Sequence, residues 1–151
     1  MRAPDYETPP SLREKCESAM RSAGVPVGDP GRFKENPTVV LDVVGTIRTQ
    51  EVSYGVKNNR WHYLQQASFD PQSPRRSGKD AHHIAFIFEH ARESANGHRA
   101  IERDAKVLLY DDTDLSEANR PLLDLIIPLA QAIDVSDPDA AADQLRAALA
   151  L

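Results

Sequence analysis

Apolar positions near the start of the chain follow a helical period. After Pro10 they fall at Leu12, Cys16, Ala19 and Met20. Ser11 and Glu14 have the spacing of a capping box, in which each side chain pairs with a free backbone amide at the start of a helix. Gly24 and Pro26 then interrupt the pattern. We therefore expect a helix over 12–22 that buries Cys16, followed by a loop over 24–37.

The next segments have the composition of β-strands. Residues 38–44 are dense in β-branched side chains, and strands over 52–56 and 61–65 flank an Asn58-Asn59 turn. A two-residue turn there pairs one set of residues on an aromatic, apolar face: Val56 with Trp61, and Tyr54 with Tyr63. The same register pairs the other set on a polar, basic face: Lys57 with Arg60, Gly55 with His62, and Ser53 with Leu64.

The second half of the chain is dominated by helical patterns. A polar segment rich in helix breakers, 66–79, predicts a loop before a helix over 81–95. A strand at 84–88 is the alternative to that helix, and 106–110 fits either a helix end or a strand. The apolar run after Pro121 predicts a helix over 120–133, kinked at Pro128, and a last helix follows Pro138.

These elements predict an α+β fold. We expect a short antiparallel β-sheet at about 38–65, packed against an N-terminal helix and a C-terminal group of three or four helices. The length of 151 residues suits a single domain, 1–151, because a chain of this size buries one self-sufficient core. Within it we distinguish an N-terminal helix and loop (1–37), a β-hairpin or meander (38–69) and a helical part (80–151).

Composition narrows the class of protein. The chain has no apolar run approaching the roughly 20 residues of a membrane span, and its N-terminus lacks the apolar core of a signal peptide. A single cysteine excludes an internal disulfide framework. We expect a cytoplasmic protein with no membrane contact. The excess of arginine over lysine and the alanine-rich C-terminus suggest a GC-rich bacterial or phage genome.

Charge is distributed unevenly along the chain. Residues 46–106 carry a formal charge of +3 and all five histidines, whereas residues 107–151 carry −7. The basic cluster predicted for binding comprises Lys57, Arg60, His62, Arg75, Arg76 and Lys79, with Trp61 and Tyr63 interleaved. Cations recruit phosphates and aromatic rings stack on unpaired bases, so this cluster favours nucleic acid or another phosphate-bearing ligand.

A short motif suggests an alternative chemistry. Arg76 precedes His82 by six residues, a spacing that resembles the active-site motif of HEPN-type ribonucleases. The resemblance implies a metal-free cleavage of RNA, with His82 exchanging protons and Arg76 stabilising the charged phosphate. Ser77 departs from the larger polar residue usual in that family, and HEPN domains are all-helical.

Two groups of residues are metal candidates. Asp111 and Asp112 follow a possible strand and could hold a divalent metal with Asp42. A second group combines histidines and carboxylates: Asp80, His82, His83, Glu89, His90, Glu93 and His98. The histidine group contains neither the zincin pair nor the Glu-x-x-His of di-iron bundles, and acids before a helix are already favoured by its dipole, so we expect no cofactor.

The sequence thus leaves three classes of function open. The leading hypothesis is a small binding module for nucleic acid or a phosphate-rich ligand. The alternatives are a small nuclease, metal-free or dependent on aspartate-bound metal, and a non-catalytic adaptor that binds proteins through its acidic helical third. The apolar C-terminal helices also suggest a homodimer.

Overall fold

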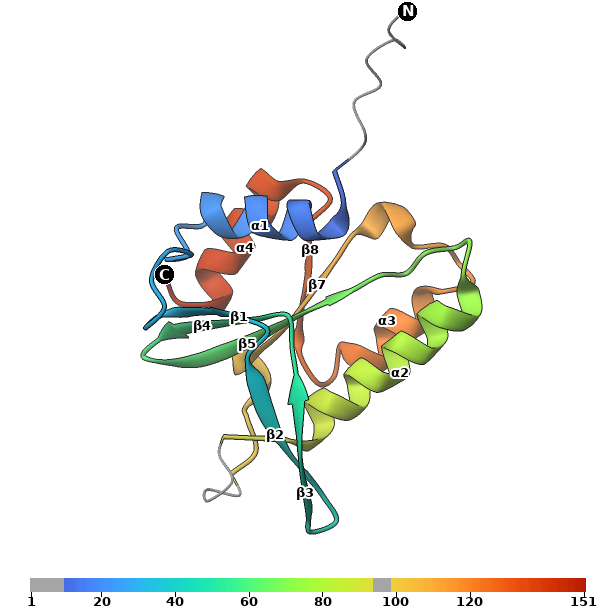
Figure 1. The fold of residues 1–151 in the computed structure, drawn as a ribbon. Coiled ribbons are helices and arrows are strands. Elements are labelled where there is room, and N and C mark those ends of the chain that lie inside the picture. Colours follow the sequence, from blue (N-terminus) through green and yellow to red (C-terminus); the bar gives the residue numbers. More distant parts are fainter. Residues whose placement is uncertain (1–9, 94–98) are drawn as a thin grey trace, which may run out of the picture.

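The computed structural model describes residues 10–93 and 99–151, and it has the expected α+β composition. Its strands form two sheets (Figure 1). The larger has the order β1 (Phe33–Glu35), β4 (Tyr54–Asn58), β5 (Arg60–Ala67), β7 (Lys106–Tyr110) and β8 (Gln131–Asp134). The smaller has the order β3 (Thr46–Glu51), β2 (Thr38–Val43) and β6 (Ala91–Arg92).

The larger sheet is mixed, not antiparallel throughout as predicted. β1, β4 and β5 are antiparallel, whereas β5, β7 and β8 are parallel. Parallel neighbours need long crossovers, and these are provided by α2 (Pro74–His90) and α3 (Arg120–Ile126). β7 is apolar on both faces, as expected of a parallel strand covered on both sides.

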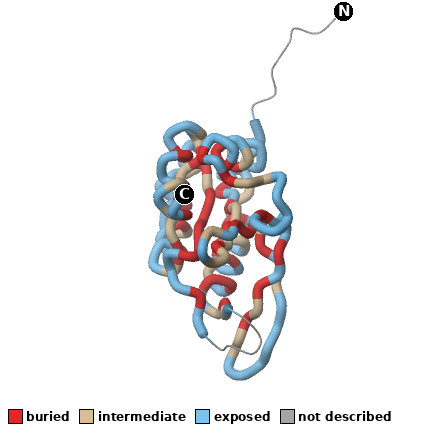
Figure 2. The backbone as a smooth tube through the Cα atoms, turned by 90° about the vertical axis from the view of Figure 1, so that its left-hand side faces the viewer, coloured by how far each residue is buried: buried red, intermediate tan, exposed pale blue. Residues whose placement is uncertain are grey.

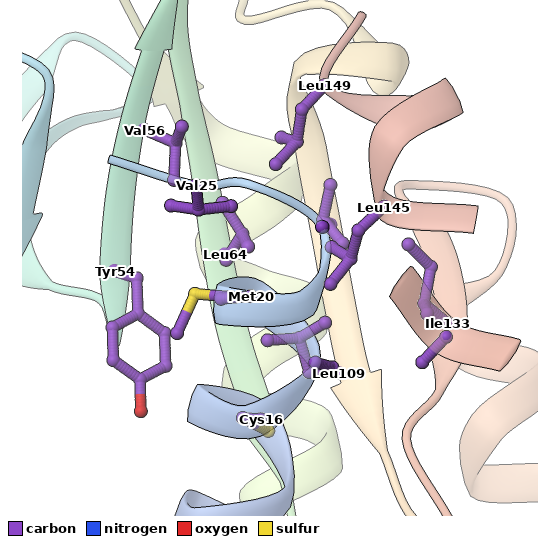
Figure 3. Close-up of a cluster of buried hydrophobic side chains, with 14 of the residues drawn as sticks. Cys16, Met20, Val25, Tyr54, Val56, Leu64, Leu109, Ile133, Leu145 and Leu149 are labelled. Atoms are coloured by element: carbon purple, nitrogen blue, oxygen red, sulfur yellow. The ribbon is translucent and has the colours of Figure 1, made fainter. Parts of the chain in front are cut away.

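One face of the larger sheet is covered by α1 (Leu12–Ser22) and α4 (Pro138–Ala148), which lie against each other (Figure 1). The predicted first helix is confirmed, with the Ser11 hydroxyl accepting from the Glu14 amide. The core beneath these helices draws on α1, four strands and α4: Cys16, Met20, Val25, Tyr54, Val56, Leu64, Leu109, Ile133, Leu145 and Leu149 (Figure 3). Burial raises the pKa of Cys16 to about 12, which makes its thiol a poor nucleophile.

The opposite face is covered by α2 and α3 over the parallel strands. Phe69, Phe88, Leu108, Leu123 and Ile126 form the centre of that second core. In the backbone view coloured by burial, buried segments run through the middle of the molecule, between exposed loops (Figure 2). Alternate residues of β7 therefore serve two cores: Leu108 on this face, and Val107 and Leu109 on the other.

The smaller sheet packs beside β5 and extends away from the body as the β2–β3 hairpin (Figure 1). Its buried side joins Val39 and Leu41 to Ile87 of α2 and to the half-buried Tyr63 of β5. At the tip, Val44 is 99% exposed and has a φ of 53°, a left-handed conformation that is unfavourable for a β-branched residue.

Two predicted helices have different limits in the structure. The expected helix over 120–133 ends at Ile126, because Pro128 lacks an amide hydrogen and residues 131–134 gain backbone partners by pairing with β7. The helix expected from 81 begins at Pro74, which occupies its first turn, so much of the predicted loop 66–79 is helical. The strand alternative for 84–88 is wrong, and 106–110 is a strand.

The β4–β5 hairpin exists, but its predicted register is wrong by one residue. Val56 pairs with His62 and Lys57 pairs with Trp61. Asn59 takes a φ of 64°, and the Asn58 side chain donates to the carbonyls of Leu149 and Ala150 just after α4. A shift of one residue exchanges the faces, so His62 is buried on the α1–α4 side. Trp61 and Tyr63 lie on the opposite side.

Within the described ranges, no helix combines the length and apolar composition needed to cross a membrane.

Candidate functional site

The observed register brings cations and aromatic rings onto one face of the sheet. Residues opposite one another on antiparallel strands share a face, so Lys57 and Trp61 lie together, as do Lys34, Gly55 and Tyr63. Lys34 comes from β1, a strand that the sequence analysis placed in a loop. This combination was not predicted, because the predicted register put the rings and Lys57 on opposite faces.

Three of these residues, Lys57, Trp61 and Tyr63, line a cavity of about 330 Å³. One wall is the hairpin, and the other is the segment around β6 and the short η1 helix (Arg103–Ala105). The lining residues are Lys57, Asn59, Arg60, Trp61, Tyr63, Glu93, Ile101, Glu102 and Ala105. The volume is at the lower end of the range for small-molecule sites, and the lining mixes rings, cations and carboxylates.

Arg60 ties the two walls of this cavity together. Its Nη1 donates to Glu102 Oε2 and its Nη2 pairs with Asp104 Oδ1, both at 2.8 Å. These bonds raise the pKa of Arg60, and Arg60 in turn lowers the pKa of Asp104. Because two carboxylates already neutralise its charge, Arg60 is poorly placed to bind a phosphate.

Trp61 is held in place by close contact with its neighbours. A Cβ atom added at Gly55 would lie 3.1 Å from Pro37 Cγ, a tight contact, and 3.4 Å from Trp61 Cε3, so the indole lies directly against Gly55. Lys34 Nζ lies 4.9 Å from the centroid of the indole ring, within the range of a cation–π interaction. The ring is therefore oriented before any ligand arrives.

The back of the cavity is a buried layer around Tyr63. Tyr63 is half-buried, and burial and the nearby Glu93 both raise the pKa of its phenol. Its neighbour across the parallel pair, Lys106, is buried and donates to the Phe88 carbonyl at 2.7 Å, near the C-terminal end of α2. This contact fixes α2 against the sheet behind the cavity.

His62 lies on the other side of the sheet. It is only 3% exposed, and its Nδ1 has no hydrogen-bond partner among the described residues. It lines a second opening of about 360 Å³ between the hairpin tip and the end of α4, together with Asn58, Arg60, Asp104 and Gln131. Burial is the main cause that lowers the pKa of His62, so the imidazole is neutral at pH 7.

The remaining predicted cations lie elsewhere. Arg75, Arg76 and Lys79 are exposed in the first two turns of α2. α2 begins beyond the far end of β5, whose eight residues span roughly 23 Å (Figure 1). Arg76 lines a cavity of about 190 Å³, where Asp70 and Asp80 are also present. The hairpin cations and the α2 cations therefore do not converge.

The residues of the HEPN-like motif are not brought together. Arg76 and His82 are both exposed on α2, about 9 Å apart along its axis and on different sides. The mixed sheet also differs from the all-helical fold that the resemblance implies.

The predicted metal ligands lie apart or already take part in hydrogen bonds and ion pairs. Asp42 lies on β2 and accepts from the Gly45 amide, whereas Asp111 lies at the end of β7. Asp111 is buried, pairs with Lys15 Nζ and accepts from the Thr113 amide and hydroxyl. Asp112 follows it and lies within an ion-pair distance of Arg120, at 3.8 Å.

The histidine–carboxylate group forms no metal site among the described residues either. His82 and His83 are exposed on α2, and His90 packs against Phe86 with ring centroids 4.6 Å apart. His98 lies outside the described residues.

Comparison with models of protein families, with curated proteins and with solved structures finds no match for this chain.

Proposed function

We propose that this protein binds single-stranded nucleic acid, taking one nucleotide into the cavity between the β4–β5 hairpin and the β6–η1 segment. The observation that supports this most directly is the hairpin register, which aligns Lys57 with Trp61 and Lys34 with Tyr63 on one face. Aromatic faces stack on bases of any sequence, and lysines beside them neutralise phosphates.

The arrangement of charge in the cavity matches the asymmetry of a nucleotide. Lys57 lines the hairpin wall and Lys34 reaches the Trp61 ring from β1, and neither lysine forms an ion pair with another described residue. Glu93 and Glu102 belong to the opposite wall. A nucleotide carries its negative charge on the phosphate and hydrogen-bond donors on the base, so the phosphate would lie by the lysines.

The test uses a fluorescein-labelled single strand of eight nucleotides and its duplex, with binding followed by fluorescence anisotropy. The protein has one tryptophan, so quenching of Trp61 emission in the unlabelled complex reports directly on the site. We expect saturable binding of the single strand, with log affinity falling linearly against log salt by about 0.7 for each phosphate contact. Binding of the duplex alone, or no change in Trp61 emission, would overturn the proposal.

Charge variants locate the site. Lys57→Gln and Lys34→Gln should each weaken binding and reduce the salt slope by about 0.7, the loss of one contact. Arg21→Gln is the matched control, because Arg21 is exposed on α1, which covers the opposite face of the sheet. If substitution of Arg75, Arg76 and Lys79 together abolishes binding while the hairpin variants do not, the site is at α2 and the cavity proposal is wrong.

A further inference from the structure

The carboxylates that line the cavity can determine which base it accepts. Stacking on Trp61 or Tyr63 does not distinguish bases, whereas hydrogen bonds to a base edge do. Two carboxylates line this wall, Glu93 and Glu102. Glu102 forms an ion pair with Arg60, whereas Glu93 forms no ion pair with another described residue.

The backbone at Glu93 is held firmly beside the rings. Glu93 directly follows β6, whose Arg92 pairs with Val40 of β2 and bridges to Ala100. The Glu93 amide donates to the Arg99 carbonyl at 2.9 Å. An exposed carboxylate is thus presented from a paired strand end to a cavity that also contains Trp61 and Tyr63.

An ionised carboxylate is a hydrogen-bond acceptor only, with two parallel lone-pair directions. Among the bases, guanine offers two adjacent donors on its pairing edge, the N1 hydrogen and the 2-amino group. Adenine presents one donor next to an acceptor, and that acceptor would face the carboxylate oxygen. Charge-assisted, bidentate hydrogen bonds are also the stronger kind.

We infer that the cavity selects guanine, with the Glu93 carboxylate accepting from N1–H and from the 2-amino group while the base stacks against the aromatic wall. This inference rests on the proposed function and specifies its ligand. The phosphate of the same nucleotide would lie toward Lys57, across the cavity from Glu93.

The experiment titrates the protein with four mononucleotides and follows Trp61 emission. Guanosine, inosine, adenosine and uridine monophosphates differ in donors on the base edge, and inosine lacks only the 2-amino group of guanine. We expect the affinity order guanosine, then inosine, then adenosine, with the first and third separated by about tenfold or more. Equal affinities for all four would overturn the inference and leave nucleotide binding intact, whereas binding of none would remove the proposed function as well.

The variant Glu93→Gln provides the sharper test. A glutamine amide has one acceptor and one donor group, so it cannot accept from both N1–H and the 2-amino group of guanine, whereas it matches the adenine edge. The preference for guanosine over adenosine monophosphate should therefore be lost. Glu89→Gln is the matched control, since Glu89 is exposed on α2 and does not line the cavity.

A Glu93→Gln protein that keeps the original order would refute the role of Glu93. Thermal unfolding of both variants should match that of the natural chain, since both side chains are exposed. A large loss of stability in Glu93→Gln would mean that this side chain maintains the fold, and would also count against the inference.

Discussion

The Lys15–Asp111 ion pair should couple the first helix to the end of the central strand. The two residues are 96 positions apart in the sequence, and their side chains are 20% and 6% exposed. A Lys15→Met substitution leaves the Asp111 carboxylate buried, with the two Thr113 donors but no counter-charge. Asp111→Asn instead leaves the ammonium of Lys15 without a partner, though that group lies nearer to solvent.

The loss of stability expected on breaking the Lys15–Asp111 pair lies between two limits. Exposed pairs contribute at most about 1 kcal/mol, whereas breaking a buried pair costs about 3–5 kcal/mol. For this half-buried pair we expect Lys15→Met to lower the free energy of unfolding by about 2 kcal/mol. In a domain of this size that corresponds to a fall in Tm of about 4–8 °C. The double variant should be less destabilised than the sum of the single variants by about 1–2 kcal/mol.

The assay is urea unfolding followed by circular dichroism at pH 7 and at pH 3. Burial by itself would raise the pKa of Asp111, but the Lys15 ammonium and the Thr113 donors hold the pKa below its ordinary value of 3.8. A carboxyl with a lowered pKa stabilises the fold above its unfolded pKa and loses that contribution as the pH falls through its folded value. The coupling should therefore be present at pH 7 and smaller at pH 3.

Additive effects of the two substitutions at pH 7 would refute this account of the Lys15–Asp111 contact. Arg13→Met is the comparison, because Arg13 pairs with Glu17 on the same helix while remaining 62% exposed. Its effect should be far smaller than that of Lys15→Met.

Two further predictions concern His62 and Val44. Because burial lowers the pKa of His62, its unfolded form binds the proton more readily, and the free energy of unfolding should fall as the pH drops below about 6.5, by at most about 1.4 kcal/mol per pH unit. Chemical denaturation at pH 7 and pH 5.5 should show a smaller fall in His62→Leu, and equal falls would contradict the burial argument. Val44→Asn should raise the free energy of unfolding by about 1 kcal/mol, because asparagine tolerates the left-handed conformation and precedes Gly45 in the hairpin turn. A thermal melt showing no gain or a lower Tm would indicate that the exposed valine contributes something else to the fold.

Local chemistry was sufficient to predict several elements. The capping box and helical spacing gave α1, the β-branched run gave β2, and the chain after Pro138 gave α4. Each of these segments has a strong local preference for helix or strand, which does not depend on contacts with distant residues. The α+β class followed from the same preferences.

The candidate site depended on contacts that the sequence could not show. The predicted hairpin register satisfies the local turn chemistry, but in the observed register Asn58 also donates to the carbonyls of Leu149 and Ala150, more than 90 residues away. The observed register places Trp61 and Tyr63 on the face of Lys57 and buries His62. The chemistry-bearing residue types were visible in advance, but the arrangement of the cavity was not.

The sequence by itself determined where helices and strands can form and which residues could carry charge or stack on a base. Tertiary structure decided that residues 131–134 become a strand, because the edge of β7 offers backbone partners that an isolated segment lacks. It likewise separated the α2 cations from the hairpin and brought Glu93 and Lys57 into the lining of one cavity. Hydrogen bonds and burial between distant segments determine these features, and a local sequence pattern reveals neither of them.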